Sequence, residues 1–171
     1  MKFERVTGYD DVNLPKRATM GAAGYDFECA ADTTCSAHAI TLIPTGIKCQ
    51  IDDGYYLQLA VRSSTPKKKG LILANSIGIV DSDYYNNPDN EGHIMFQVYN
   101  YTDTDTTIIK GERIGQGVFV RYGLTNDDMV DSLRMGGFGS TDNTFSAIFN
   151  VDSLDKENKD YFAENWEGIA P

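Results

Sequence analysis

The chain has 171 residues, enough for one domain with a buried core, and no apolar run approaches the length of a membrane-spanning helix. Its 25 acidic and 15 basic residues give a net charge of −10, which opposes binding to the phosphate backbone of nucleic acids. The N-terminus lacks the apolar stretch of a signal peptide, and an odd number of cysteines, three, favours reduced thiols. We therefore expect a cytoplasmic protein that binds neither nucleic acid nor membranes.

Four segments rich in β-branched and aromatic residues predict β-strands, and turn residues separate them. In chain order the segments are 39–51, 54–61, 93–100 and 105–120. No segment before residue 150 has the apolar period of a helix over three turns. The expected fold class is all-β, in the form of a sandwich, a jelly roll or a barrel.

The C-terminal part of the chain differs from the rest in composition. Residues 125–171 contain ten acidic and three basic residues, and the aromatic residues within 153–171 have spacings that one short helix could place on one side. We interpret this part as an appended tail that docks through its aromatic side chains. The expected boundaries are a core over 1–133, a glycine-rich arm over 134–142 and an acidic tail over 143–171.

The segment 78–94 concentrates acidic residues and could be a calcium loop, an acidic hairpin tip or a reaction site. An EF-hand loop that began at Asp81 would have Tyr85 at position 5 and Gly92 at position 12, where calcium needs oxygen ligands. The calcium interpretation therefore fails on spacing. The other two interpretations stay open at this point.

Two further clusters are candidates for chemistry. Cys29, Cys35, His38 and Cys49 could hold zinc, but they include no Cys-x-x-Cys pair, and buried thiols are the better interpretation. A serine hydrolase is not supported, because the sequence has no Gly-x-Ser-x-Gly segment.

Two segments favour phosphate binding. Arg62, Ser63 and Ser64 follow a predicted strand, and a guanidinium beside two hydroxyls offers good donors to phosphate oxygens. The sequence RMGGFGST at 134–141 is either a mobile linker or a lid whose glycines let the backbone close on a ligand. The lysines at 67–69 are interpreted as a solvated face.

Taken together and in order, five segments resemble the motifs of the trimeric dUTP pyrophosphatase (dUTPase) family, which includes phage-encoded members. They are AGYD at 23–26, RSS at 62–64, NSIGIVDSDY at 75–84, GERIGQ at 111–116 and GGFGST at 136–141. The resemblance implies a jelly-roll-like β-sandwich that forms a homotrimer with active sites shared between subunits. It also implies hydrolysis of dUTP to dUMP and pyrophosphate, with Mg²⁺ held by the substrate phosphates and water and by no direct protein ligand.

The same resemblance assigns roles to individual residues. Asp81 would be the general base that activates the water attacking the α-phosphorus. Tyr84 would pack against the deoxyribose and leave no space for a ribose 2′-hydroxyl. The side-chain amide of Asn75 and main-chain groups around Gly78 and Val80 would contact the uracil edge.

The remaining assignments concern the phosphates and the arm. Phe138 would stack on uracil, and Asp26 would organise the site without reacting. The residues assigned to the phosphates and their surroundings are Arg62, Ser63, Ser64 and Gln116 and, in the arm, Arg134, Gly139, Ser140 and Thr141.

Two departures from the family pattern and two alternatives are visible in the sequence. Residues 85–91 enlarge the hairpin tip, and Arg134 stands one residue closer to Phe138 than the arm arginine usually does. A dCTP deaminase of the same fold would use a glutamate where this chain has Gln97, and an amide cannot act as that base. A regulatory, protein-binding role would use the enlarged tip and the segment 143–171 as contact surfaces.

Overall fold

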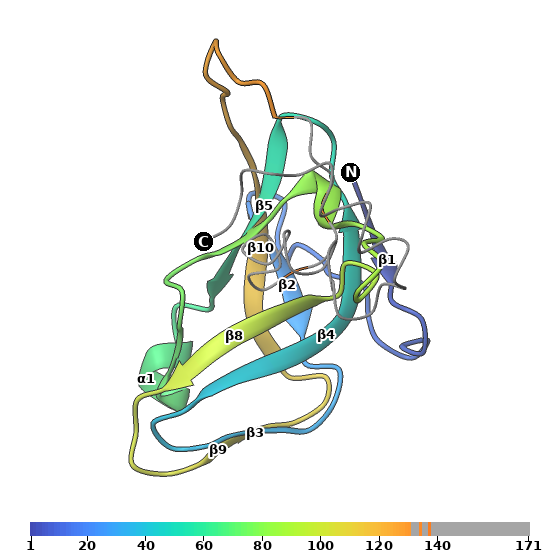
Figure 1. Cartoon of the computed structure of the whole chain (residues 1–171). Helices are drawn as coiled ribbons and strands as arrows, with labels where there is room; N and C mark the ends of the chain where they lie inside the picture. Colours follow the sequence, from blue (N-terminus) through green and yellow to red (C-terminus); the bar gives the residue numbers. More distant parts are fainter. Residues whose placement is uncertain (131–133, 135–136, 138–171) are drawn as a thin grey trace, which may run out of the picture. The chain divides into compact units, whose positions relative to one another are not determined.

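A computed structural model of the chain describes residues 1–130, 134 and 137 (Figure 1). By the density of internal contacts, residues 1–137 form one compact unit and residues 138–171 another. The second unit lies outside the described residues, and so do the expected tail and most of the expected arm.

The described part is built mainly of short β-strands, which confirms the all-β fold class. The strands are β1 (Lys2–Arg5), β2 (Tyr25–Glu28), β3 (Thr33–Cys35), β4 (Ile40–Gln50), β5 (Tyr55–Val61), β6 (Leu71–Leu73), β7 (Gly78–Val80), β8 (Ile94–Asn100), β9 (Thr106–Ile108) and β10 (Arg113–Arg121). A short helix, α1 (Thr65–Lys69), follows β5, and one 3₁₀ turn, η1 (Ser82–Tyr84), follows β7. None of the described helices is long and apolar enough to cross a membrane.

The strands form three antiparallel sheets. One has the order β1-β4-β8-β6, the second β2-β10-β5-β7, and β3 pairs with β9 in a third. In Figure 1, β4 and β8 run side by side, and β5, β10 and β2 form the neighbouring layer. The ring of Phe27 on β2 lies 5.7 Å from that of Phe96 on β8, so the two larger sheets share one core.

The core is filled from the inward faces of these two sheets. Its fully buried side chains include Phe27, Ile43, Leu57 and Phe96. The alternating burial of β8, in which every second residue from Ile94 to Asn100 is buried, matches a strand with one face on the core. This strand was expected from its β-branched and aromatic residues and the turn residues around it, and the burial pattern agrees with that prediction.

All four expected strand segments contain strands, but their division differs in one case. The segment 105–120 is two strands, β9 and β10, because a turn interrupts it at Gly111, whose φ of +82° is the left-handed conformation that glycine adopts readily. The strands that were not expected are mostly short, three or four residues each, which leaves little period to detect.

The cysteines agree with their interpretation as buried thiols. Cys29, Cys35 and Cys49 are free and buried. Burial raises the pKa of Cys49 to about 12, so its thiol stays protonated near neutral pH. Within the part of the chain that the structure describes, no group of three potential metal-ligating side chains comes together.

Candidate functional site

The predicted catalytic segment lies at the edge of a sheet. β7 pairs with β5 on one side only, with Val80 opposite Leu57 and Gly78 opposite Leu59, and it is the outermost strand of its sheet. Among the described strands, no other strand uses the main-chain groups on its outer edge, as recognition of a base edge would require. Asn75 is exposed in the turn that precedes β7, where its carbonyl accepts a hydrogen bond from the Ile77 amide at 2.7 Å.

Asp81 stands where β7 passes into η1. Its backbone is extended, with φ −79° and ψ 161°, and the next three residues form the 3₁₀ turn. The strand therefore ends at Asp81, and the turn brings Tyr84 back beside it. One short segment thus supplies both the carboxylate and the aromatic ring that the sequence singled out.

Arg134 binds both carboxylates of this segment. Its Nη2 donates to Oδ2 of Asp81 at 2.6 Å, and its Nε donates to Oδ1 of Asp83 at 2.7 Å. The Arg134 side chain is 19% exposed, whereas those of Asp81 and Asp83 are about half exposed. From the sequence, Arg134 was assigned to the phosphates. Its contact with Asp81, the candidate base, was not expected and is seen only in the structure.

Tyr84 is buried, and its hydroxyl makes two hydrogen bonds. Only 8% of it is exposed, and its hydroxyl donates to the carbonyl of His93 at 3.0 Å and accepts from Nδ2 of Asn90 at 2.8 Å. Gly137 lies against the ring, since a Cβ built on it would be 2.6 Å from Cε2 of Tyr84. Burial raises the pKa of Tyr84, which keeps the hydroxyl neutral and able to donate.

The Arg-Ser-Ser segment lies at the far end of β5. Arg62 and Ser63 directly follow the strand, and Ser64 is the N-cap of α1 without a side-chain capping bond. Arg62 accepts a backbone hydrogen bond from Thr65 at 2.9 Å, which closes the turn. Lys69, at the end of α1, pairs with Glu112 at 2.8 Å, so this lysine of the expected solvated face is engaged.

Gln116 and Asp26 are brought together by the pairing of β10 with β2. They are directly opposite in the register, and Gln116 is also opposite Ala60 on β5. The chain approaches Gln116 closely at Gly24, where an added Cβ would be 2.3 Å from Oε1 of Gln116. The segments AGYD (23–26) and GERIGQ (111–116) are therefore in contact through Gly24 and the side-chain amide of Gln116.

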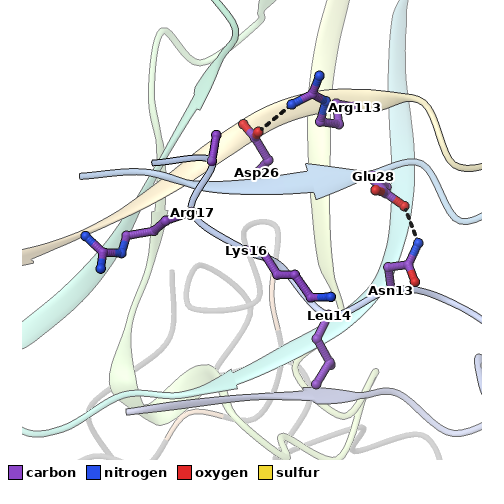
Figure 2. Close-up of a pocket in the computed structure, with 8 residues that line it drawn as sticks. Asn13, Leu14, Lys16, Arg17, Asp26, Glu28 and Arg113 are labelled. Atoms are coloured by element: carbon purple, nitrogen blue, oxygen red, sulfur yellow. Dashed lines mark hydrogen bonds and ion pairs between the residues drawn. The ribbon is translucent and has the colours of Figure 1, made fainter. Parts of the chain in front are cut away.

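An open cleft of about 340 Å³ begins at Asp26. Its lining is Asn13, Leu14, Lys16, Arg17, Ala18, Asp26, Glu28 and Arg113. Figure 2 shows Arg113 joined to Asp26 from the adjacent strand, through Nη1 and Oδ2 at 3.0 Å. Arg17 donates to the carbonyls of Met20 and Ala22, both at 3.0 Å, and so shapes the loop before β2.

Sequence reasoning did not single out Arg113, Lys16 or Arg17. Arg113 lies within GERIGQ, so its place in that segment was a usable signal. For Lys16 and Arg17 the sequence offers no comparable signal, because their position beside Asp26 depends on the bridge between Lys16 and Asp26. Phe138, Gly139, Ser140 and Thr141 lie outside the described residues.

The candidate residues form two groups, not one. Asp81, Tyr84 and Arg134 lie where β7 meets the beginning of β5, whereas Arg62–Ser64 and Gln116 lie at its end. Leu57, opposite Val80, and Arg62 are five residues apart along a strand, a separation of roughly 17 Å. A single chain therefore does not assemble the complete set in one place.

Comparison with known proteins adds an independent finding. The profile of the dUTPase family matches residues 10–142. A deoxyuridine 5′-triphosphate nucleotidohydrolase of Lactococcus lactis is 49% identical over 143 residues, which are 81% of this chain and 95% of that protein. The crystal structure of dUTPase from Streptococcus mutans is similar with a TM-score of 0.72 and 52% identity, over 74% of this chain and 99% of its own.

A more distant likeness concerns the fold alone. The dUTPase of Staphylococcus bacteriophage 80alpha has a TM-score of 0.62 at 20% identity, over 78% of this chain and 97% of its own. That phage protein is described as controlling the transfer of virulence genes.

Proposed function

Because the chain belongs to the dUTPase family, we propose that it hydrolyses dUTP to dUMP and pyrophosphate. The observation that carries the proposal is the segment from β7 to η1, which presents Asp81 beside the buried Tyr84 at an open sheet edge. The main chain of the edge strand would hydrogen-bond to the uracil, and the Tyr84 ring would pack against the deoxyribose. The Asp81 carboxylate would accept a proton from the attacking water.

In the proposed mechanism Asp81 is the general base. It takes a proton from a water molecule as the water oxygen bonds to the α-phosphorus and the bond from that phosphorus to the β-phosphate oxygen breaks. Arg134 binds Oδ2 of Asp81, so we assign Oδ1 to the water. A positioned base of this kind contributes about 10²–10⁴-fold to the rate.

Selectivity is proposed to come from the same segment. Main-chain groups along Gly78–Val80 and the amide of Asn75 would pair with the uracil edge, and Tyr84 would exclude a 2′-hydroxyl. Arg62, Ser63, Ser64 and Gln116 would bind the phosphates, with Asp26 and Arg113 fixing the strands that carry Gln116. The arm residues Arg134 and 138–141 are assigned to closure over the nucleotide.

The candidate site fits a Mg²⁺ ion that is bound through the substrate phosphates. Mg²⁺ keeps several waters and is usually bound through substrate phosphates with one or two carboxylates. Among the described residues, the neighbouring carboxylates of Asp81 and Asp83 are both ion-paired with Arg134, so we propose that the substrate phosphates and water hold the ion, with no direct protein ligand. When bound, the ion would neutralise charge on the phosphate oxygens.

We propose a homotrimer in which the two groups of residues meet across subunit contacts. Their separation along β5 supports this, because a base in one chain then needs phosphate ligands from another. Apolar side chains on the outer face of the β1-β4-β8-β6 sheet also support it, since Ile40, Leu42 and Ile72 are between 39% and 58% exposed. Burial in an oligomer would remove this apolar surface from water.

The alternatives are less well supported. Gln97 lies half-buried on β8 opposite Leu42, and its amide cannot take the proton that deamination of dCTP requires. The regulatory role remains a prediction from the sequence.

Parallel assays with dUTP, dCTP, dTTP and UTP test the proposed function. We expect pyrophosphate release from dUTP and, at equal substrate and enzyme concentrations, at least about 100-fold less from the other three nucleotides. Equal release from all four, or ammonia release from dCTP, would contradict the proposal.

A further inference from the structure

The loop Tyr85–Gly92, the enlarged hairpin tip, is a compact hydrogen-bonded structure. Asn87 is only 4% exposed, and its Nδ2 donates to the carbonyl of Tyr84 at 2.8 Å. Its Oδ1 accepts from the backbone amides of Asp89 and Asn90 at 3.1 and 3.2 Å. Asn side chains stabilise turns in this manner, so the loop has one defined conformation.

The loop is also fastened to the first sheet. Lys48 on β4 donates to Oδ1 of Asn86 at 2.7 Å and to Oε2 of Glu91 at 3.2 Å. The hydroxyl of Tyr85 donates to Glu4 on β1 at 2.6 Å. These contacts tie both ends of the loop to strands that are not part of the candidate site.

Asn90 connects this loop to Tyr84. Its Oδ1 accepts from Nδ2 of Asn87 at 2.9 Å and from the amide of Gly92 at 3.0 Å, which fixes the orientation of the side-chain amide. Its Nδ2 then points at the Tyr84 hydroxyl, 2.8 Å away. Because that hydroxyl donates its proton to the carbonyl of His93, it accepts from Asn90 with a free lone pair.

We propose that Asn90 is a positioning residue that sets the selectivity of the enzyme for deoxyribose over ribose. The proposal rests on the proposed function, in which the Tyr84 ring excludes the 2′-hydroxyl. A ring excludes an added oxygen only while it cannot retreat, and Asn90 bonds the hydroxyl at its far end to the hydrogen-bonded loop. The enlarged tip thus contributes to substrate selectivity by holding Tyr84 from the side away from the sugar.

The test is a double-mutant cycle with Asn90→Ala and Tyr84→Phe, measured as the ratio of kcat/KM for dUTP to that for UTP. We expect Asn90→Ala to lower this ratio about fivefold or more, chiefly by raising kcat/KM for UTP. Tyr84→Phe removes the same hydrogen bond from the other side and should lower the ratio similarly. The double variant should then lose less than the product of the two single effects, because both changes remove the Asn90–Tyr84 hydrogen bond.

The controls separate the possible failures. Asp89→Ala, an exposed side chain in the same loop, should leave the ratio unchanged. Wild-type enzyme without preference for dUTP over UTP would contradict the proposed function itself. An unchanged ratio in Asn90→Ala, or a further equal loss when it is added to Tyr84→Phe, would overturn the role of Asn90. If Asn90→Ala does not fold, an unchanged ratio in Tyr84→Phe alone overturns it.

Discussion

At the scale of single residues, the candidate site depends on contacts between side chains from distant parts of the chain as much as on the reactive groups themselves. Asp81, Tyr84 and Gln116 could be assigned from sequence because their segments resemble known motifs. The contacts of Arg134 with Asp81 and of Asn90 with Tyr84 could not, because each joins positions whose distance depends on the folded chain. A residue type predicts which bonds are available, and tertiary structure decides which are made.

Gly24 offers a test at this scale. Gly24→Ala would place a Cβ 2.3 Å from Oε1 of Gln116 and force that side chain out of position. We expect KM for dUTP to rise severalfold with little change in Tm, since a flexible side-chain end can move without disturbing the fold. Gly21→Ala is the matched control, because nothing lies within 4 Å of its added Cβ. An equal KM in both variants would argue against Gln116 as a phosphate ligand.

At the scale of elements, the long strands were predictable and the short ones were not. The alternation in β8 and the β-branched runs in β4 and β5 carry enough residues to show a period. β6 and β7, three residues each, are strands because β8 and β5 pair with them. The sequence therefore locates the candidate catalytic segment but not its place at a sheet edge.

His93 connects Tyr84 to β4, because its carbonyl accepts from the Tyr84 hydroxyl and its ring accepts from Gly46. From this buried ring we predict a pH dependence of stability. Its buried Nε2 accepts from the Gly46 amide at 2.8 Å, and burial lowers the pKa of His93 below its ordinary value of 6.5. The unfolded chain therefore binds the proton first as pH falls. The contribution of His93 to the free energy of unfolding is fully present above about pH 6.5 and is lost as pH falls toward the lowered value.

Urea unfolding between pH 7.5 and 5 measures this effect. We expect the wild-type free energy of unfolding to decrease over this window. His93→Gln, although less stable at every pH, should show a smaller decrease because it lacks the titrating ring. Parallel curves for the two proteins would exclude His93 as the source.

At the scale of the whole molecule, the candidate residues of one chain lie in two groups, at the two ends of β5. The all-β fold class could be predicted from sequence, and the resemblance to the family supplied the candidate residues. Their division between the two ends of β5 could not, because it follows from the register of β5 with β7 and β10. This division is the strongest structural argument for sites shared between subunits.

Co-assembly of two variants tests the proposal that Asp81 activates water for dUTP hydrolysis in a site completed by another subunit. Pyrophosphate release from dUTP is measured for Asp81→Asn, for the double variant Arg62→Ala/Gln116→Ala, and for trimers containing both chains. We expect a loss of about 100-fold or more for Asp81→Asn and at least about tenfold in kcat/KM for the double variant. Mixed trimers should recover activity, and at equal random mixing about a quarter of all the sites in the mixture should be intact. Undiminished activity of Asp81→Asn, or no recovery in mixed trimers, would contradict the claim.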